Sequence, residues 1–539
     1  MQKPVQPSIV AFVFVAAAML AASGLTSHSE AADGQPLKLE LRSRTETAND
    51  SGRFHTVTRA ETWNANQTAI IVCDMWDYHH CLNAVRRGTE MAPRMNEVLK
   101  NARERGATII HAPSSCTETY ADHAARKRAQ AVKRVDNLPI EIGKWCYKIP
   151  EEERGKYPID QTDGGEDDDL VEHAAWAKKL AAMGRNPKAP WKAQMDALEI
   201  DADRDFISDN GEEIWSILER NDCNNVILLG VHTNMCVLGR PFGLRQMAKN
   251  GKNVVLMRDM TDTMYNPQKS PFVSHFTGTD LIVEHIEKWV CPTITSDQIL
   301  GGKPFRFKKD TRPHVAIVIA EQEYLTNETL PPFALDHLGK EFKVSFVFAN
   351  EKERNDLPGI DVLNDADVLL LSVRRRVLPP AQMSVVRKYL ESGKPIVGIR
   401  TANHALLLRK QAAPKGFESW DTWDADIFGG SYTNHYGAGP EVKVSVADSG
   451  GAHAILKGVK AASIKGKGSL YIVNPLAEST TPLLTGAIPD KAAETIAWAN
   501  RTKFGGKSFY TSLGHVDDFA QPEFRKLLAN AVRWAASRE

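Results

Sequence analysis

Short apolar runs that alternate with amphipathic helical patterns constrain the fold of this chain more than any other feature of its sequence. Between residues 68 and 290, runs typical of buried strands are followed by segments in which apolar residues recur at helical spacing. Parallel strands need a crossover connection, usually a helix, so this order predicts a parallel sheet with helices on both faces. The predicted strands are 68–75, 107–114, 197–202, 225–232 and 253–260, and the predicted helices include 92–106, 211–221 and 280–290.

A second strand–helix series runs from residue 314 to residue 537. A chain of 539 residues is too long for one ordinary core. We therefore predict an α/β protein with two doubly wound parallel-sheet domains in tandem, at residues 36–300 and 312–539. A glycine-, proline- and lysine-rich linker at 301–311 joins them. Two alternating segments, 37–44 and 53–63, predict an additional hairpin, and the polar stretch 116–191 reads as a solvated loop.

The first 33 residues differ in composition from the rest of the chain. Lys3 precedes the apolar stretch "IVAFVFVAAAMLAASGL", which is followed by small and polar residues. This order is typical of a secretory signal peptide, and the alternative is an uncleaved anchor. The apolar stretch is short for a membrane span, which favours cleavage at about residue 33. We expect an exported protein, periplasmic or extracellular.

Charge and cysteine content narrow the function classes. Lys+Arg and Asp+Glu both number 67, so no basic field points to a nucleic-acid partner. All seven cysteines lie between Cys73 and Cys291. An odd number leaves at least one thiol free within the chain, and Cys236 is a candidate. The sequence does not indicate the oligomeric state.

Two predicted strands end in residues that carry chemistry. Asp74 follows the first strand, and Cys236 lies in the first turn of the helix after the strand 225–232. Ligands of open parallel sheets bind at the carboxyl ends of the strands, so both side chains can reach one crevice. A carboxylate beside a thiol can take its proton and produce a thiolate nucleophile. The structural alternative makes Asp74 a helix cap and Cys236 a core residue.

Both segments resemble the motifs of a known family. "TAIIVCDMWD" and "NNVILLGVHTNMCV" are similar to the first-strand and nucleophile motifs of isochorismatase-like cysteine hydrolases, which include nicotinamidases. The resemblance implies hydrolysis of a C–N or related bond in a small molecule, with Asp74 as general base and Cys236 as nucleophile. It also implies a cis peptide at Val231–His232 that aims backbone N–H groups near Met235 at the oxyanion.

The sequence departs from that family at the third catalytic group. The family carries a lysine before the helix 211–221, and Asp203 stands near that position here. Two carboxylates beside a thiol would disfavour the thiolate, so a cation or strong donor must come from elsewhere. Lys144, Lys192 or a histidine of "DYHH" are the candidates. If none approaches, a non-catalytic role is the alternative.

Further polar residues stand at predicted strand ends in the first domain. His79, His111 and Asp259 are pocket candidates; His80, Arg258 and Asp262 could serve the same purpose or only brace loops. Adjacent histidines point in different directions, so we assign no metal, and we expect no cofactor.

The second series is similar to ThuA-like (trehalose-utilisation) domains. The residues that carry the resemblance are "AEQEYLTNETLPPF", "GIRTANHAL", "FGGSYTNHY" and the segment from "SLGHVDDF" onward. Thr401 or Ala402 stands where a glutamine amidotransferase of related fold would have cysteine, so that chemistry is excluded. The resemblance implies a carbohydrate-derived substrate, although the polar residues could only brace loops. The pocket candidates are Glu323, Arg400, His404, His435, His515 and Asp517.

Overall fold

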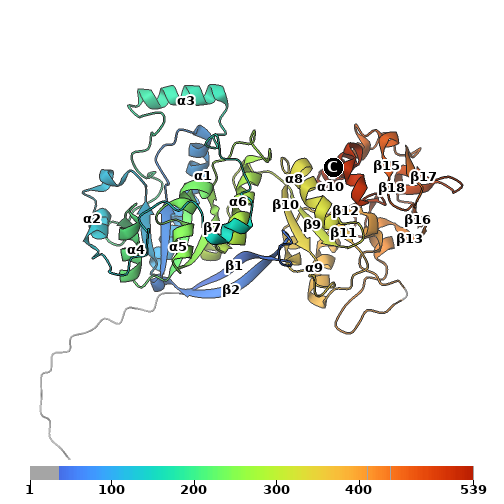
Figure 1. The fold of residues 1–539 in the computed structure, drawn as a ribbon, viewed down its shortest axis with the longest axis horizontal. Coiled ribbons are helices and arrows are strands. Elements are labelled where there is room, and N and C mark those ends of the chain that lie inside the picture. The colour runs from blue at the N-terminus through green and yellow to red at the C-terminus, as the bar shows by residue number, and fades with distance from the viewer. Residues whose placement is uncertain (1–35, 410, 438, 538–539) are drawn as a thin grey trace, which may run out of the picture. The chain divides into compact units, whose positions relative to one another are not determined.

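The computed structural model describes residues 36–409, 411–437 and 439–537, and the predicted signal peptide lies outside them. The first sheet has the strand order β2-β1-β8-β7-β6-β3-β4-β5, of which β1, β2 and β7 are labelled in Figure 1. The strands from β8 to β5 run parallel, while β1 and β2 form the predicted hairpin and join antiparallel to β8. The strand bounds are β1 Pro36–Glu46, β2 Phe54–Asn64, β3 Thr68–Cys73, β4 Thr108–Ala112, β5 Phe206–Ile207, β6 Asn225–Val231, β7 Asn253–Asp262 and β8 Thr293–Ile294.

The helices of this half follow the predicted alternation, with one strand displaced. The predicted strand 197–202 is wrong, because β5 lies at Phe206–Ile207. Asp201 instead closes a turn by accepting hydrogen bonds from the backbone of Asp203 and Arg204. The helix bounds are α1 Leu82–Glu104, α2 Ala124–Ala131, α3 Leu170–Ala182, α4 Gly211–Arg220, α5 Leu244–Lys249, α6 His275–Trp289 and α7 Asp297–Leu300.

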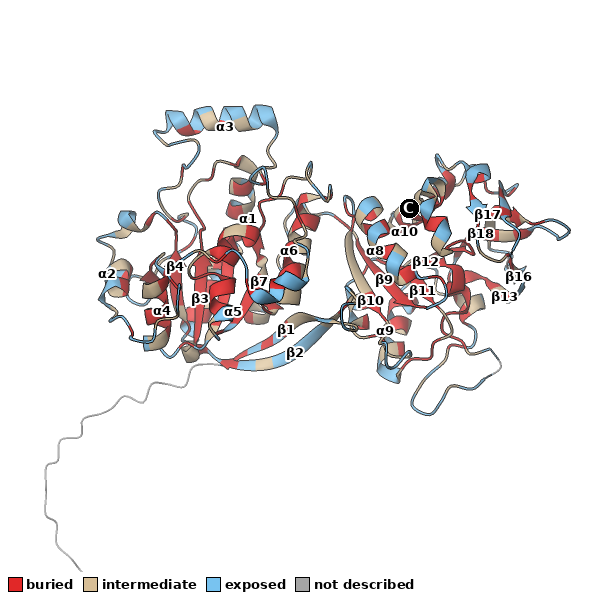
Figure 2. Ribbon diagram, viewed as in Figure 1, coloured by how far each residue is buried: buried red, intermediate tan, exposed pale blue. Residues whose placement is uncertain are grey.

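The stretch 116–191 is not the simple solvated loop that its composition predicts. It contains α2, α3 and a 3-10 turn at Pro150–Arg154. Most of α3 is exposed, whereas β3 is buried along its whole length (Figure 2). Apolar residues of the stretch, such as Val135 and Ile142, pack into the core of the first sheet. Local composition missed these helices because their support comes from distant segments.

The second sheet has the order β10-β9-β11-β12-β19-β18-β17-β14-β15. The first five strands in this order are parallel to one another, and the remaining four pair antiparallel. The prediction of a parallel sheet therefore holds for the five strands that include β11 and β12, after which the candidate site residues of this domain lie. Strands β13 and β16 form a separate antiparallel pair. The strand bounds of this half are β9 His314–Ala320, β10 Lys343–Phe348, β11 Val368–Val373, β12 Ile396–Ile399, β13 Gly430–His435, β14 Val442–Val446, β15 Lys465–Gly466, β16 Tyr471–Leu476, β17 Thr481–Ala487, β18 Glu494–Arg501 and β19 Lys507–Thr511.

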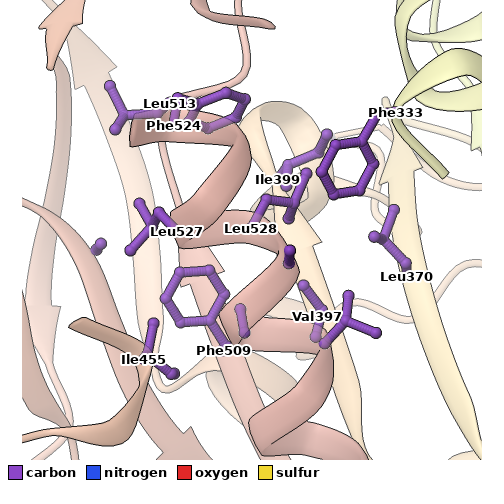
Figure 3. Close-up of a cluster of buried hydrophobic side chains, with 14 of the residues drawn as sticks. Phe333, Leu370, Val397, Ile399, Ile455, Phe509, Leu513, Phe524, Leu527 and Leu528 are labelled. Carbon is purple, nitrogen blue, oxygen red and sulfur yellow. The ribbon is translucent and has the colours of Figure 1, made fainter. Parts of the chain in front are cut away.

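Helices α8 (Thr326–Leu338), α9 (Pro380–Glu391) and α10 (Pro522–Ala536) accompany this sheet. The α10 residues Phe524, Leu527 and Leu528 are fully buried and lie among sheet residues such as Val397 and Phe509 (Figure 3). Apolar residues at helical spacing therefore anchor α10 to the sheet.

The described residues bear on the state of the cysteines and on membrane-spanning helices. All seven cysteines are free and buried. In the part of the chain that the structure describes, no helix combines the length and the apolar character needed to cross a bilayer.

Candidate functional site

Asp74 and Cys236 meet at the carboxyl edge of the first sheet. Strands β3 and β6 are parallel neighbours, with Cys73 paired to Gly230, so the residues after each strand emerge side by side. Cys236 lies in a single π-helical turn, Thr233–Val237, that begins directly after β6. Its thiol lies close enough to the Asp74 carboxylate for the carboxylate to raise the pKa of the thiol. The topology therefore brings together the two residues that the sequence selects.

Arg240 completes this group. Its Nε donates to Oδ2 of Asp74 at 2.9 Å, while Oδ1 of Asp74 accepts from the backbone N–H of Ser114 at 2.8 Å. The guanidinium lies 5.3 Å from the centre of the Trp145 ring. Arg240 stands four residues after Cys236, the spacing that places two side chains on one helix face. That spacing was the available signal, and our sequence reasoning missed it.

Burial and charge set the protonation of the pair. The pKa of the Cys236 thiol is raised well above its ordinary value, first by burial and then by Asp74, whereas Arg240 lowers it. The pKa of Asp74 is also raised by burial, and Arg240 opposes that shift. The site therefore holds a neutral thiol beside a carboxyl group whose charged form is disfavoured by burial and favoured by Arg240.

The two predicted lysines, Lys144 and Lys192, make their contacts with residues other than Asp74 and Cys236. Nζ of Lys144 lies 3.1 Å from Oε1 of Glu141, and its side chain is 73% exposed. Nζ of Lys192 donates to the backbone oxygen of Gly184. Asp203 is exposed in the turn before β5. A cation does approach from outside the usual strand, as we expected, but it is Arg240.

The peptide bond between Val231 and His232 is cis, as the family resemblance implies. The backbone of His232 lowers the pKa of the Cys236 thiol and so favours the thiolate. The N–H of Met235 donates to the carbonyl of His232, so it is already engaged. The N–H of Met235 is therefore not free to donate a hydrogen bond to an oxyanion, although Met235 lines a cavity.

A cavity of about 530 Å³ lies against the π-helical turn that carries Cys236. Asn234 and Met235 form part of its wall, and the stretch 116–191 supplies most of the rest. The predicted loop thus forms most of the wall of a cavity next to the turn, although Cys236, Asp74 and Arg240 are not among the residues that line it. The lining residues are Trp145, Tyr147, Lys148, Glu152, Gly155, Tyr157, Gln161, Asn234, Met235, Arg245 and His285.

Histidines and tryptophans gather beside the same turn. The His79 ring lies 4.7 Å from the His232 ring, and Trp76 stacks on Trp191 at 4.6 Å. Burial lowers the pKa of His79 and holds the pKa of His232 at about 4, so both are neutral near pH 7. His80 instead pairs with Glu166. His79 therefore belongs to an apolar, aromatic wall.

Other predicted pocket residues serve the framework. His111 is buried between Gln194 and Asp205, and Asp259 accepts hydrogen bonds from Ser296 and the backbone of Phe305. They anchor loops, because their partners lie in neighbouring segments and away from Cys236. Arg258 donates to Thr293, and Asp262 pairs with Arg87 and His275.

The side chains of Cys81, Asp167 and Asp168 place potential metal-ligand atoms within 4.8 Å of one another. Arg87 forms a bidentate pair with Asp167, and Asp168 accepts from the backbone N–H groups of Leu82 and Asn83. Asp167 therefore balances the charge of Arg87, and Asp168 caps the N-terminal turn of α1. These contacts explain why the two carboxylates lie close together without a metal ion.

In the second half, Arg400 is the centre of the predicted pocket residues. It follows β12 with φ +50° and is 3% exposed. The guanidinium donates to the backbone oxygens of Ser469 and Ser512, and it lies 4.6 Å and 4.1 Å from the ring centres of Tyr324 and Tyr471. These tyrosines were not predicted, because aromatic residues in a sequence read first as core.

The remaining predicted residues of this half lie around Arg400. The His404 ring lies 4.6 Å from Tyr432, whose hydroxyl is 2.6 Å from Nδ1 of His435. The His515 ring lies 5.9 Å from Tyr324. Two residues are more peripheral: Glu323 forms an ion pair with Arg374, and Asp517 is exposed beside His515.

The comparisons with known proteins address the two halves differently. Residues 315–535 match the family model described as ThuA, trehalose utilisation, so this part of the chain is a ThuA domain. Among curated proteins, no match to the chain was found.

Several solved structures are similar to parts of the chain. A ThuA-like protein from Parabacteroides merdae is 14% identical, with a TM-score of 0.32 over 42% of this chain and 91% of its own. A cysteine hydrolase from Pseudomonas syringae pv. phaseolicola is 15% identical, with a TM-score of 0.27 over 44% of this chain and 92% of its own. An isochorismatase family protein from Burkholderia thailandensis is 15% identical, with a TM-score of 0.19 over 36% of this chain and 79% of its own.

Proposed function

We propose that the chain is an exported hydrolase, periplasmic or extracellular, that cleaves a C–N or related bond of a small molecule with Cys236 as nucleophile. The observation that carries the proposal is the group of Cys236, Asp74 and Arg240 at the ends of β3 and β6, in which Arg240 donates a hydrogen bond to Asp74 and Asp74 acts on the pKa of Cys236. A thiol, a base and a cation that holds the base are the parts that nucleophilic acyl transfer needs.

The proposed reaction proceeds in two balanced steps. Asp74 takes the thiol proton as the sulfur bonds to the substrate carbonyl carbon, and the same proton then passes to the leaving nitrogen as the C–N bond breaks. In the second step a water gives its proton to Asp74 and its hydroxyl to the carbon. The C–S bond breaks, and the sulfur recovers the proton. Arg240 positions Asp74 throughout.

Thiol labelling and amide hydrolysis by the full chain test this proposal. Loss of the general base in Asp74→Asn should lower the rate of hydrolysis about 10²- to 10⁴-fold. Asp259→Asn is a matched control, because Asp259 is a partly buried aspartate of β7 in the same sheet but contacts Ser296. Selective alkylation that disappears in Cys236→Ser supports the nucleophile. Equal alkylation of several cysteines in the folded protein would contradict it.

A second candidate function is carbohydrate binding by the ThuA domain, with or without catalysis in the first half. The rings of Tyr324, Tyr432 and Tyr471 near Arg400 favour it, because aromatic faces beside hydrogen-bonding groups suit sugar rings. Calorimetric titration of the full chain with mono- and disaccharides tests this function. Binding that Tyr471→Ala abolishes in a folded protein would support it.

A further inference from the structure

Arginines gather at the carboxyl edge of the second sheet. Arg374, Arg375 and Arg376 directly follow β11, and Arg400 directly follows β12. Strands β11 and β12 are parallel neighbours, so both segments emerge at the same edge. The backbone N–H of Arg375 donates to the carbonyl of His404 at 3.1 Å, which joins the two segments.

The hydrogen-bonding capacity of this cluster is not filled by the protein. Among the described residues, the Nε atoms of Arg375, Arg376 and Arg400 are buried and have no hydrogen-bond partner. Nδ1 of His404 and Oγ1 of Thr401 are in the same condition. Arg376, Arg400 and His404 are each only 3% exposed. Buried donors without acceptors are costly, so their accumulation at one strand edge points to an acceptor that the chain does not supply.

Positive charge exceeds negative charge at this edge. Of the carboxylates after β9, Glu323 pairs with Arg374 at 2.7 Å, and Glu321 accepts from the backbone of Tyr324 and Thr326. The guanidinium of Arg375 forms no ion pair with a described residue.

The lowered pKa of His404 is consistent with a surplus of positive charge around it. Its pKa is lowered to about 3, first by burial and then by Arg375, Arg374, Arg409 and Arg400. The imidazole is therefore neutral and adds no charge of its own.

Aromatic rings surround the same edge. Tyr471 and Tyr432 have ring centres 4.6 Å apart, Arg400 lies over Tyr471, and Arg409 lies over Tyr432 at 4.9 Å. Arginine is well suited to carboxylates and phosphates, because its planar fork matches their oxygens.

We propose that this edge of the ThuA domain binds an anionic group, a carboxylate or a phosphate, with Arg375 as its principal contact; the terminal nitrogens of Arg400 already donate to Ser469, Ser512 and Tyr324. The inference rests on the proposal that the ThuA domain binds a small molecule, and it adds that the recognised feature is negative charge. The anion could be free or borne by a sugar.

Calorimetric titration of the full chain with four probes distinguishes these sources: glucuronate, glucose 6-phosphate, inorganic phosphate and glucose. We expect at least one anionic probe to bind about tenfold or more tightly than glucose, with affinity that falls as ionic strength rises. Tighter binding of the sugar acids than of inorganic phosphate supports a sugar-borne group. The reverse order supports a free anion.

Arg375→Gln should weaken anion binding about tenfold or more, and Arg375→Lys should weaken it less. Arg387→Gln is the matched control, because this substitution removes the same charge from the same domain. Arg387 belongs to α9, and its guanidinium lies over the ring of Trp420. Circular dichroism verifies that each variant folds.

Two results would overturn the anion site. One is equal affinity for glucose and the anionic probes; the other is anion binding that Arg375→Gln leaves unchanged. Glucose binding under those conditions would leave the carbohydrate proposal intact. Failure of all four probes to bind would contradict both.

Discussion

At the scale of single residues, the chemistry of the first sheet depends on how Asp74 is held. The residue is fully buried, and its two oxygens contact Ser114 and Arg240 while the thiol of Cys236 lies alongside. A buried carboxylate without a cation would be protonated and could not accept a proton. Arg240 is therefore a positioning residue whose effect passes through Asp74.

Replacement of Arg240 tests this role. Because Arg240 lowers the pKa of Cys236, Arg240→Gln should raise that pKa further, and each pKa unit lowers the thiolate fraction about tenfold. The rate of alkylation by iodoacetamide, measured against pH, should fall and its midpoint should move to higher pH. Arg240→Lys should restore part of the rate. Arg134→Gln, at an exposed ion pair with Glu212, is the control. An unchanged pH profile in Arg240→Gln would contradict the role of Arg240.

At the scale of elements, the approach of β6 to β3 places Cys236 beside Asp74. Gly230 has φ +111°, and a Cβ at this position would lie 2.1 Å from the carbonyl oxygen of Cys73. That oxygen is backbone of the neighbouring strand and cannot move as a side chain can. The close contact therefore requires glycine just before Val231 and His232.

We expect Gly230→Ala to separate β6 from β3 and to lower the free energy of unfolding by roughly 2 kcal/mol or more. Alkylation of Cys236 should also lose its dependence on Asp74. Gly251→Ala is a matched control: Gly251 also has positive φ, +84°, but a Cβ there would meet open space. Urea unfolding of both variants measures the difference. Equal destabilisation would show that backbone strain, and not the contact with Cys73, dominates.

Another element-scale contact fastens the stretch 116–191 to the helices beneath it. Glu152 accepts two hydrogen bonds from Arg245 at 2.8 Å and one from His285 at 2.8 Å. These partners lower the pKa of Glu152 to about 2, although burial opposes them. Removal of this carboxylate should therefore loosen one wall of the 530 Å³ cavity.

The pH dependence of unfolding tests the Glu152 contact. A carboxyl group whose pKa is lower in the folded state stabilises the fold above its unfolded pKa, about 4.3, and that contribution disappears as the pH falls. We expect wild type to exceed Glu152→Gln by on the order of 2 kcal/mol at pH 6, and the difference to shrink between pH 5 and pH 2. Urea unfolding at each pH measures it. A constant difference would contradict the lowered pKa.

At the scale of the whole molecule, the chain builds two candidate sites on two sheets by the same principle. Each gathers polar residues at the carboxyl ends of neighbouring parallel strands, β3 and β6 in one sheet and β11 and β12 in the other. The first uses a thiol, a carboxylate and one arginine, whereas the second is rich in arginine and tyrosine. The residues of the two groups belong to different sheets.

We therefore expect the two sites to respond independently to substitution. Cys236→Ser should abolish selective alkylation and leave anion affinity within about twofold, and Arg375→Gln should do the converse, because separate groups show nearly additive effects. The double variant should combine both losses. Alkylation kinetics and calorimetry on the same preparations measure the two properties. A large effect of either substitution on the other site would show energetic coupling.

The sequence by itself determined the α/β alternation, the hairpin before β3, and the choice of Asp74 and Cys236. Those features depend on local periodicity and on which residues end a strand, and both can be read along the chain. Apolar periodicity also located α10 and the strands that it covers.

Only the tertiary structure decided which cation serves Asp74, because all three of Lys144, Lys192 and Arg240 carry a positive charge and only the fold determines which side chain reaches Asp74. Only the tertiary structure shows that the polar stretch 116–191 forms a cavity wall, because the stretch is held by hydrogen bonds to Arg245 and other residues far along the chain. The arginines after β11 and β12 became one cluster for the same reason. Strand pairing joins segments that are distant in sequence, and their chemistry is defined only by what they meet.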